Sequence, residues 1–164
     1  MTQKKAVFFD RDGVINIDSN YYTYKTEDFV VNETVFESLK LLQKNDFLLF
    51  IITNQSGVAK NIYTNDDVEF VHAYFNKLCI DKSIVITEIF HCPHHPDYSR
   101  CICRKPDSLL IEKALAQFNV SASKSFFIGD RARDIEAADK VGLSSFLIES
   151  NSNLLPVIQK IITS

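Results

Sequence analysis

Short apolar segments alternate along the chain with longer segments in which apolar residues recur at helical spacing. The strand-like segments are residues 6–9, 47–53, 85–90, 125–128 and 145–148. Most of their residues are apolar, which is typical of strands buried on both faces. Strands that alternate with helices predict an α/β fold. We expect a three-layer, doubly wound parallel sheet with helices on both faces and right-handed crossovers.

The helical segments each carry one apolar stripe. The stripes contain Val35, Leu39 and Leu42; Val68, Val71, Phe75 and Leu78; Leu110, Ala114 and Phe118; Ile135 and Ala138, before Gly142; and Leu154, Ile158 and Ile161. Thr34 and Glu37 have the spacing of a capping box at the start of the first helix. We expect the stripes to form the core and not a binding site.

Size and charge narrow the class of protein. The 164 residues are 46% hydrophobic and carry a net charge of −3. This length suits a single domain over residues 1–164 with no separate cap domain. Charges are interspersed, and the longest apolar run, 47–52, is too short to cross a bilayer. We therefore expect a cytoplasmic monomer with no nucleic-acid or membrane partner and with a small ligand.

Acidic residues follow two of the strand-like segments. Asp10 and Asp12 close the first, and Gly13 lets the chain turn away. Asp130 and Asp134 follow the fourth, at the start of a helix. The first pair alone could be a surface turn. Because the carboxyl ends of parallel strands form ligand sites, we expect the carboxylates to converge there, where hard oxygen ligands suit Mg²⁺.

Possible phosphate ligands follow at two later points. Thr53, Asn54, Gln55 and Ser56 come directly after the second strand and can present hydrogen-bond donors to phosphate oxygens. Arg104 and Lys105 place two cations ahead of a helix. Either group alone is common on protein surfaces. Together with the acidic pairs, they predict a phosphoryl-transfer site.

A segment rich in Cys and His precedes the two cations. We expect a closed, structural Zn²⁺ site with the ligands Cys92, His94, Cys101 and Cys103. His91 or His95 could replace His94 as the fourth ligand. Since Cys103 directly precedes Arg104 and Lys105, the metal would fix both cations against the phosphate.

These motifs resemble the haloacid dehalogenase (HAD) superfamily of phosphatases over about residues 7–142. The four family motifs match Asp10-x-Asp12, Thr53, Lys105, and Asp130 with Asp134. The resemblance implies a HAD-like Rossmannoid fold and Mg²⁺-dependent hydrolysis of a phosphomonoester through an aspartyl phosphate. In this reading Asp10 is the nucleophile and Asp12 the general acid and base.

The same resemblance assigns the remaining roles. Thr53 and Lys105 bind phosphate. Asp130 binds Mg²⁺ together with Asp10 and the backbone carbonyl of Asp12, and Asp134 is a possible member of the metal shell. A zinc-stabilised interaction module without turnover is the alternative of a different class, but it would have no need to retain all these residues.

The zinc loop and residues 53–59 resemble the branch of the superfamily, subfamily IIIA, that acts on heptose bisphosphate or histidinol phosphate. Residues 10–16 and the tyrosine-containing loop are closer to the heptose type, whereas Arg131 is closer to the histidinol type. Arg104 and Arg131 could bind a second anionic group, which only the bisphosphate has. We therefore favour the sugar bisphosphate and keep histidinol phosphate as the alternative. Tyr21, Tyr22 and Tyr24 could contact the substrate or simply pack on the surface.

Overall fold

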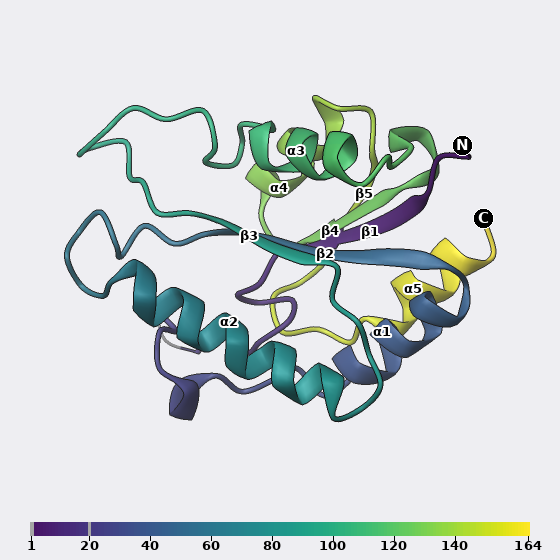
Figure 1. The fold of residues 1–164 in the computed structure, drawn as a ribbon, viewed down its shortest axis with the longest axis horizontal. Helices are drawn as coiled ribbons and strands as arrows, with labels where there is room; N and C mark the ends of the chain where they lie inside the picture. Colours follow the sequence, from purple (N-terminus) through teal and green to yellow (C-terminus); the bar gives the residue numbers. More distant parts are fainter. Residues whose placement is uncertain (1, 20) are drawn as a thin grey trace.

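Figure 1 shows the fold in the computed structural model, which describes residues 2–19 and 21–164. Within these residues, a parallel sheet of five strands has the order β3-β2-β1-β4-β5. The strands are β1 (Lys5–Phe9), β2 (Phe47–Asn54), β3 (Glu88–Cys92), β4 (Phe126–Gly129) and β5 (Ser144–Leu147). Val7 of β1 pairs with Leu49 of β2 and with Phe126 of β4. The end of β1 therefore lies between the ends of two other strands.

Helices cover both faces of the sheet. The helices are α1 (Val35–Lys44), α2 (Asn65–Ile80), α3 (Leu109–Gln117), α4 (Ala132–Asp139) and α5 (Leu155–Ile162), with short 3-10 helices at Thr26–Asp28 and Ala122–Lys124. In Figure 1, α1, α2 and α5 lie below the sheet and α3 and α4 above it. This arrangement confirms the predicted three-layer α/β fold.

Alternate residues of the central strands enter two different cores. Val7 and Phe9 pack in the core beneath α1, α2 and α5, whereas Phe8 packs in the core beneath α3 and α4. The Phe8 ring stacks on Phe50 at 4.9 Å between centroids and on Phe127 at 6.4 Å. Both faces of β1 are buried, which explains why its sequence is apolar throughout.

The third strand starts later than its sequence suggests. Residues 85–90 are the predicted strand, but β3 runs from Glu88 to Cys92. Thr87 explains the difference, because its hydroxyl accepts the hydrogen bond from the Leu49 amide at 3.2 Å. A side chain thus replaces the backbone carbonyl that would extend the ladder. The strand continues instead to Cys92, at the start of the predicted zinc loop.

The predicted capping box at Thr34 is wrong. Thr34 precedes α1 in a helical backbone conformation and makes no side-chain cap. Its hydroxyl instead accepts a hydrogen bond from the Leu154 amide at 3.0 Å, which joins the starts of α1 and α5. The true capping box lies at α2, where Thr64 and Asp67 exchange hydrogen bonds.

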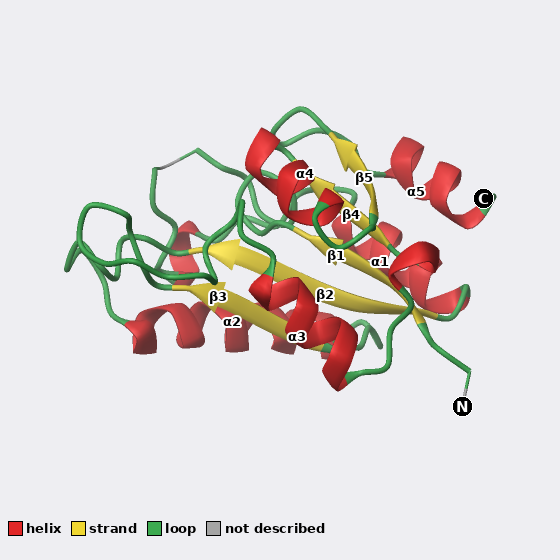
Figure 2. Cartoon of the chain, turned by 90° about the horizontal axis from the view of Figure 1, so that it is seen from above, coloured by secondary structure: helices red, strands yellow, loops and turns green. Residues whose placement is uncertain are grey.

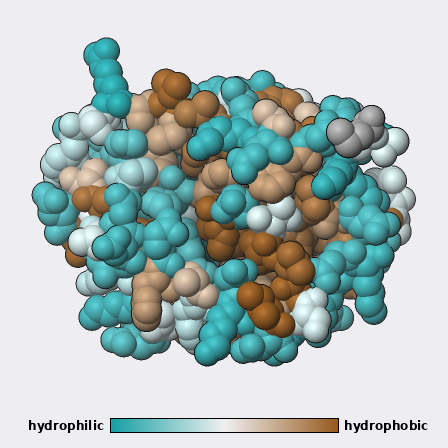
Figure 3. Space-filling view, in the orientation of Figure 1, coloured by the Kyte–Doolittle hydropathy of each residue, from teal (hydrophilic) through white to brown (hydrophobic). Residues whose placement is uncertain are grey.

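The loops after the strands gather on one side of the molecule. Figure 2 shows the arrowheads of β2 and β3 pointing to this side. Figure 3 shows hydrophilic side chains over most of the face that it displays, with apolar side chains in smaller patches. In the described part of the chain, no helix has the length and apolar character needed to span a bilayer.

Candidate active site

Asp10 and Lys105 form a buried ion pair just beyond the end of β1. The exposed fraction of Asp10 is 5% and that of Lys105 is 1%. Lys105 Nζ lies 2.9 Å from Asp10 Oδ1 and 2.7 Å from Asp134 Oδ1. It also donates to the Ile52 carbonyl at 2.7 Å. One ammonium group therefore joins the ends of β1 and β2 to the first turn of α4.

Burial and charge act in opposite directions on this pair. Burial raises the pKa of Asp10 to about 7, although the Lys105 ammonium pulls it down. Burial alone would lower the pKa of Lys105, but the charges of Asp10 and Asp134 outweigh it and the pKa lies above its ordinary value. The lysine thus stays cationic beneath the carboxylates.

The carboxylates of Asp10, Asp130 and Asp134 fit a divalent cation. One oxygen from each lies within 4.8 Å of the others. Both Asp130 oxygens are buried and have no hydrogen-bond partner within the described residues. A Cβ atom at Gly13, where φ is 86°, would overlap the Asp130 carboxylate. Hard oxygen donors with unused lone pairs are what Mg²⁺ prefers.

Asp12 faces a different set of partners. Its Oδ1 accepts hydrogen bonds from Arg11 Nη2 at 2.9 Å and from Asn16 Nδ2 at 3.0 Å, and its Oδ2 accepts one from Gln55 Nε2 at 2.9 Å. Its side chain lies outside the Asp10, Asp130 and Asp134 cluster. The two aspartates of the Asp-x-Asp motif therefore have separate environments, as different chemical tasks require.

Arg11 is a buried residue that sequence reasoning missed. Besides Asp12, it donates to the Thr23 carbonyl at 2.7 Å and to His72 Nε2 at 3.3 Å. Because a guanidinium has no acceptor, the neutral His72 ring must carry its proton on Nδ1. The only sequence signal was its position between the two aspartates, in the turn after β1.

The residues after β2 support the site from a second side. Thr53 is buried, and Ser56 lines the same cavity as Asp10 and Asp12. Asn54 uses both ends of its amide on the Lys105 backbone, with Nδ2 donating to the carbonyl and Oδ1 accepting from the amide, each at 3.0 Å. Asn54 thereby fixes the chain that carries the lysine.

The cavity above these residues has a volume of about 300 Å³ and a polar lining. Arg104, Arg131 and Arg133 contribute cations to its wall. Arg131 also lies 3.4 Å from the carboxylates of Asp18 and Asp130. Sequence reasoning predicted the first two arginines and missed Arg133, which lies one residue into α4.

The aromatic residues near the cavity divide into two groups. Tyr21 and Tyr22 line it together with Tyr63, which sequence reasoning also missed. Among the described residues that form the cavity wall, Tyr24 does not occur. Its ring instead stacks on Tyr63, with 4.9 Å between centroids.

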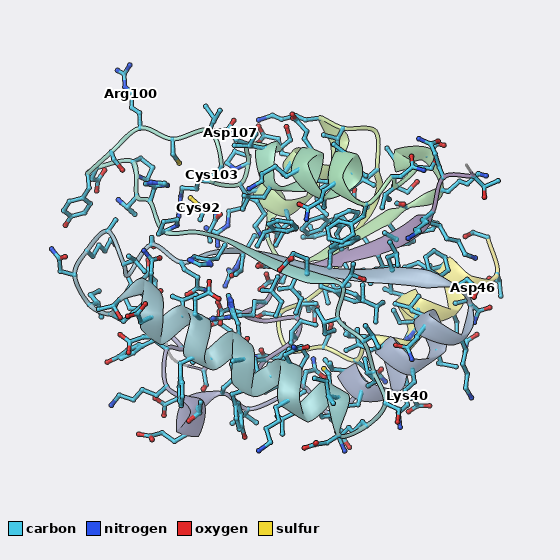
Figure 4. The ribbon with its side chains drawn as sticks, viewed as in Figure 1. Lys40, Asp46, Cys92, Arg100, Cys103 and Asp107 are labelled. Atoms are coloured by element: carbon cyan, nitrogen blue, oxygen red, sulfur yellow. The ribbon has the colours of Figure 1, made fainter. Side chains whose placement is uncertain are left out.

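The predicted zinc ligands Cys92, His94, Cys101 and Cys103 come together in one cluster. Cys92 Sγ lies 3.1 Å from Cys103 Sγ and 3.7 Å from Cys101 Sγ. His94 Nδ1 lies 3.3 Å from Cys103 Sγ. Figure 4 shows Cys92 and Cys103 side by side, from β3 and from the loop before α3. Three thiols and an imidazole at these distances suit a tetrahedral Zn²⁺ ion.

The two alternative histidines point elsewhere. His91 Nε2 lies 3.1 Å from Asn65 Oδ1, and His95 Nδ1 lies 3.5 Å from Asp97 Oδ2. The cluster is also connected to the active-site loops, because the backbone amide of Gln55 donates a hydrogen bond to the Cys92 carbonyl at 2.8 Å. Arg104 Nη1 donates to the His94 carbonyl at 3.2 Å.

Comparisons with known proteins agree with this geometry. A protein-family model described as HAD-hydrolase-like matches residues 102–160. The chain is 35% identical over 164 residues to the D-glycero-D-manno-heptose-1,7-bisphosphate 7-phosphatase of Chlorobaculum tepidum, covering 93% of this chain and 82% of that one. The chain belongs to the HAD-like phosphatases.

Two further relatives place it within the HAD-like family. It is 39% identical over 144 residues to the D-glycero-alpha-D-manno-heptose-1,7-bisphosphate 7-phosphatase of Campylobacter jejuni, covering 88% of this chain and 81% of that one. Its fold is similar to a crystal structure of the D,D-heptose 1,7-bisphosphate phosphatase from B. bronchiseptica, solved with magnesium and phosphate. The TM-score is 0.83 at 26% identity, covering 95% of this chain and 86% of that one.

In this HAD-like chain, residues from all four predicted motifs meet at one end of the sheet. Asp10, Asp12, Thr53 and Asp130 line the cavity. Lys105 lies beneath it, in contact with Asp10. The sequence-based expectation that these positions converge therefore agrees with the structure.

Proposed function

We propose that this HAD-like phosphatase removes the 7-phosphate of D-glycero-D-manno-heptose 1,7-bisphosphate. The names of the similar proteins support this substrate. The observation that carries the proposal is the Asp10 carboxylate, 2.9 Å from a buried lysine at the base of a polar cavity with arginines in its wall. A buried nucleophile and arginines within reach suit a substrate with two phosphates.

Asp10 would act as the nucleophile. One of its carboxylate oxygens would attack phosphorus, the bond from phosphorus to the sugar oxygen would break, and an aspartyl phosphate would form. Lys105 would offset the repulsion between the carboxylate and the phosphate, and the Thr53 hydroxyl would bind a phosphate oxygen. Water would then attack phosphorus and release Asp10.

Asp12 would move the protons. It would give a proton to the departing sugar alkoxide and later take one from the attacking water, a role worth roughly 10² to 10⁴ in rate. Arg11, Asn16 and Gln55 would hold its carboxylate in place between these steps. The two aspartates would thus divide the nucleophilic and the acid–base work.

Asp10, Asp130 and the backbone carbonyl of Asp12 would hold Mg²⁺, with Asp134 at the edge of its shell. When bound, the ion would neutralise charge on the transferring phosphoryl group. The two buried Asp130 oxygens support this assignment, because neither accepts a hydrogen bond within the described residues and only Oδ2 has a cation nearby, Arg131 Nε at 3.4 Å.

The residues of the cavity wall would determine substrate specificity. Arg104, Arg131 and Arg133 would bind the second phosphate of the sugar, which histidinol phosphate lacks. The Cys92, His94, Cys101 and Cys103 cluster would hold a structural Zn²⁺, because four protein ligands leave no open position. We also propose that the protein is cytoplasmic, because thiols stay reduced in that compartment, and that it is a monomer.

The test is turnover of a panel of phosphate esters with and without Mg²⁺. The panel contains both anomers of the heptose bisphosphate, histidinol phosphate and an aryl phosphate. We expect Mg²⁺-dependent release of one phosphate from the bisphosphate, with kcat/KM at least tenfold above that for histidinol phosphate. A preference for histidinol phosphate would overturn the proposed substrate.

The matched control is Asp10→Asn. It removes the nucleophile but keeps the shape of a buried side chain beside Lys105. We expect kcat to fall by at least about a thousandfold while the melting temperature stays within a few degrees of wild type. Near-normal activity in this variant would remove Asp10 from the nucleophilic role.

A further inference from the structure

Tyr63 lies outside the four family motifs, yet it contacts the residue that joins two of them. It follows β2 and precedes α2, and its exposed fraction is 5%. Its hydroxyl donates to Gln55 Oε1 at 2.8 Å. The side-chain oxygen of Gln55 therefore already accepts a hydrogen bond within the protein.

This contact decides which way the Gln55 amide faces. With Oε1 turned to Tyr63, Nε2 donates to Asp12 Oδ2 at 2.9 Å and to Thr53 Oγ1 at 2.8 Å. Both amide hydrogens are then used. Turning the amide over would bring its oxygen against the Asp12 carboxylate, where two acceptors repel each other.

The orientation has a consequence for each partner. The Thr53 oxygen already accepts a hydrogen from Gln55, so its own hydroxyl hydrogen is available to a phosphate oxygen. The Asp12 oxygen that Gln55 holds is the one that neither Arg11 nor Asn16 contacts. Gln55 lines the cavity, but both hydrogens of its side-chain amide are used on Asp12 and Thr53, so we propose a supporting role for it beside the predicted substrate contact.

Packing keeps the Tyr63 ring in place. Gly57 lies so close to the ring that a Cβ atom there would overlap it. Tyr24 stacks on the ring, with 15° between the planes, and Tyr22 meets its edge at 5.7 Å between centroids. Burial raises the pKa of Tyr63 to about 12, so the hydroxyl keeps its proton at neutral pH.

We infer that Tyr63 is a positioning residue which acts through Gln55 on the acid–base carboxylate of Asp12 and on the phosphate-binding hydroxyl of Thr53. The inference rests on the proposed function and deepens it. The Tyr63 side chain lines the cavity, but its hydroxyl is used on Gln55. Its effect is to select one of the two orientations of a neighbouring amide.

A double-mutant cycle of Tyr63→Phe and Gln55→Ala tests this chain of contacts. Tyr63→Phe keeps the ring and its packing, and we expect kcat to fall about tenfold with KM changed less than about twofold. In the Gln55→Ala background the same change should alter kcat less than about twofold, because the residue through which it acts is gone. The matched control is Tyr24→Phe, which should retain wild-type kcat because it keeps the ring that stacks on Tyr63.

Rates are measured on the heptose bisphosphate and on an aryl phosphate, with melting temperatures alongside. Tyr63→Phe as active as Tyr24→Phe would overturn the inference, and so would an equal loss in both Gln55 backgrounds, which is what a packing role predicts. A wild-type chain that hydrolyses neither ester would overturn the proposed function as well. Hydrolysis of the aryl phosphate alone would count against the proposed sugar and still decide the role of Tyr63.

Discussion

The floor and the wall of the active-site cavity are built differently. The floor consists of Asp10, Lys105 and Asp134, each at most 5% exposed and each paired with another member. The wall contains Arg131, whose side chain is 54% exposed and lies 3.4 Å from the carboxylates of Asp18 and Asp130. Burial dictates the first arrangement, because a buried charge without a partner is costly. The wall has no such constraint.

This difference separates chemistry from selectivity. The floor can take essentially one geometry, so the phosphoryl-transfer machinery is specified by the same forces that fold the chain. Exposed arginines at the wall can adopt several positions at little cost. We therefore expect the identity of the substrate to be decided at the wall, and changes there to leave the floor intact.

Replacing Lys105 with Met is the severest test of the floor. The change leaves Asp10 and Asp134 buried side by side without a cation, which should cost about 3–5 kcal/mol in the free energy of unfolding. Turnover should fall at least about a hundredfold. Urea unfolding at neutral pH measures the first effect. A cost below about 1 kcal/mol would mean that the floor is no more constrained than the wall.

Loss of the zinc cluster should act on both regions. Cys101→Ser removes one ligand, and we expect the free energy of unfolding to fall by about 2 kcal/mol, a drop of roughly 4–8 °C in melting temperature. KM should rise as well. The His94 carbonyl accepts a hydrogen bond from the Arg104 side chain, and the Cys92 carbonyl accepts one from the backbone amide of Gln55, so the cluster positions both residues. Zinc content, melting and KM are measured with Mg²⁺ in excess. Unchanged stability and KM in a zinc-free variant would contradict the role of the cluster as a clamp.

The residues of the floor were easier to predict from the sequence than the buried residues that position them. Asp10 and Asp134 follow two apolar strands, and the parallel order of such strands brings their ends together, so the convergence of these two floor residues was predictable from pattern alone. The clustering of Cys92, His94, Cys101 and Cys103 was predictable because Cys and His at this close spacing are typical of a metal site. Lys105 was a weaker prediction from the residues alone, since a lysine in a loop is ordinarily exposed, and the family resemblance strengthened it.

Buried polar residues that act through others escaped prediction. Arg11 and Tyr63 have side chains that are common on surfaces, and no spacing rule says that one will contact Asp12 and the other Gln55. Their positions depend on how the loop after β1 and the segment after β2 fold over the site. The shifted start of β3 has the same origin, because Thr87 replaces a backbone partner with its side chain.

Removing one arginine from the wall should change binding and little else. We expect Arg131→Ala to raise KM for the bisphosphate about 5–10-fold, to leave kcat within about twofold and to shift the free energy of unfolding by less than about 0.5 kcal/mol. KM for an aryl phosphate, which has one phosphate, should stay unchanged. Arg100→Ala is the matched control, because Figure 4 shows this arginine projecting away from the molecule. A fall in kcat with KM unchanged would assign Arg131 to the chemical step.

The smallest effect concerns His72, which supports Arg11 from behind the floor. Burial lowers the pKa of His72 to about 2, with the Arg11 charge adding to the shift. Between this value and the unfolded pKa near 6.5, only the unfolded chain binds the extra proton, so stability is lost as pH falls through this range. His72→Gln keeps an acceptor for Arg11 but cannot titrate. Its free energy of unfolding should therefore fall by about 0.8 kcal/mol less than that of wild type between pH 7.5 and pH 6. Urea unfolding at the two pH values measures this difference. Parallel pH profiles for wild type and His72→Gln would mean that His72 binds its proton as readily in the folded chain as in the unfolded one. The residues behind the floor would then be as open to water as the wall.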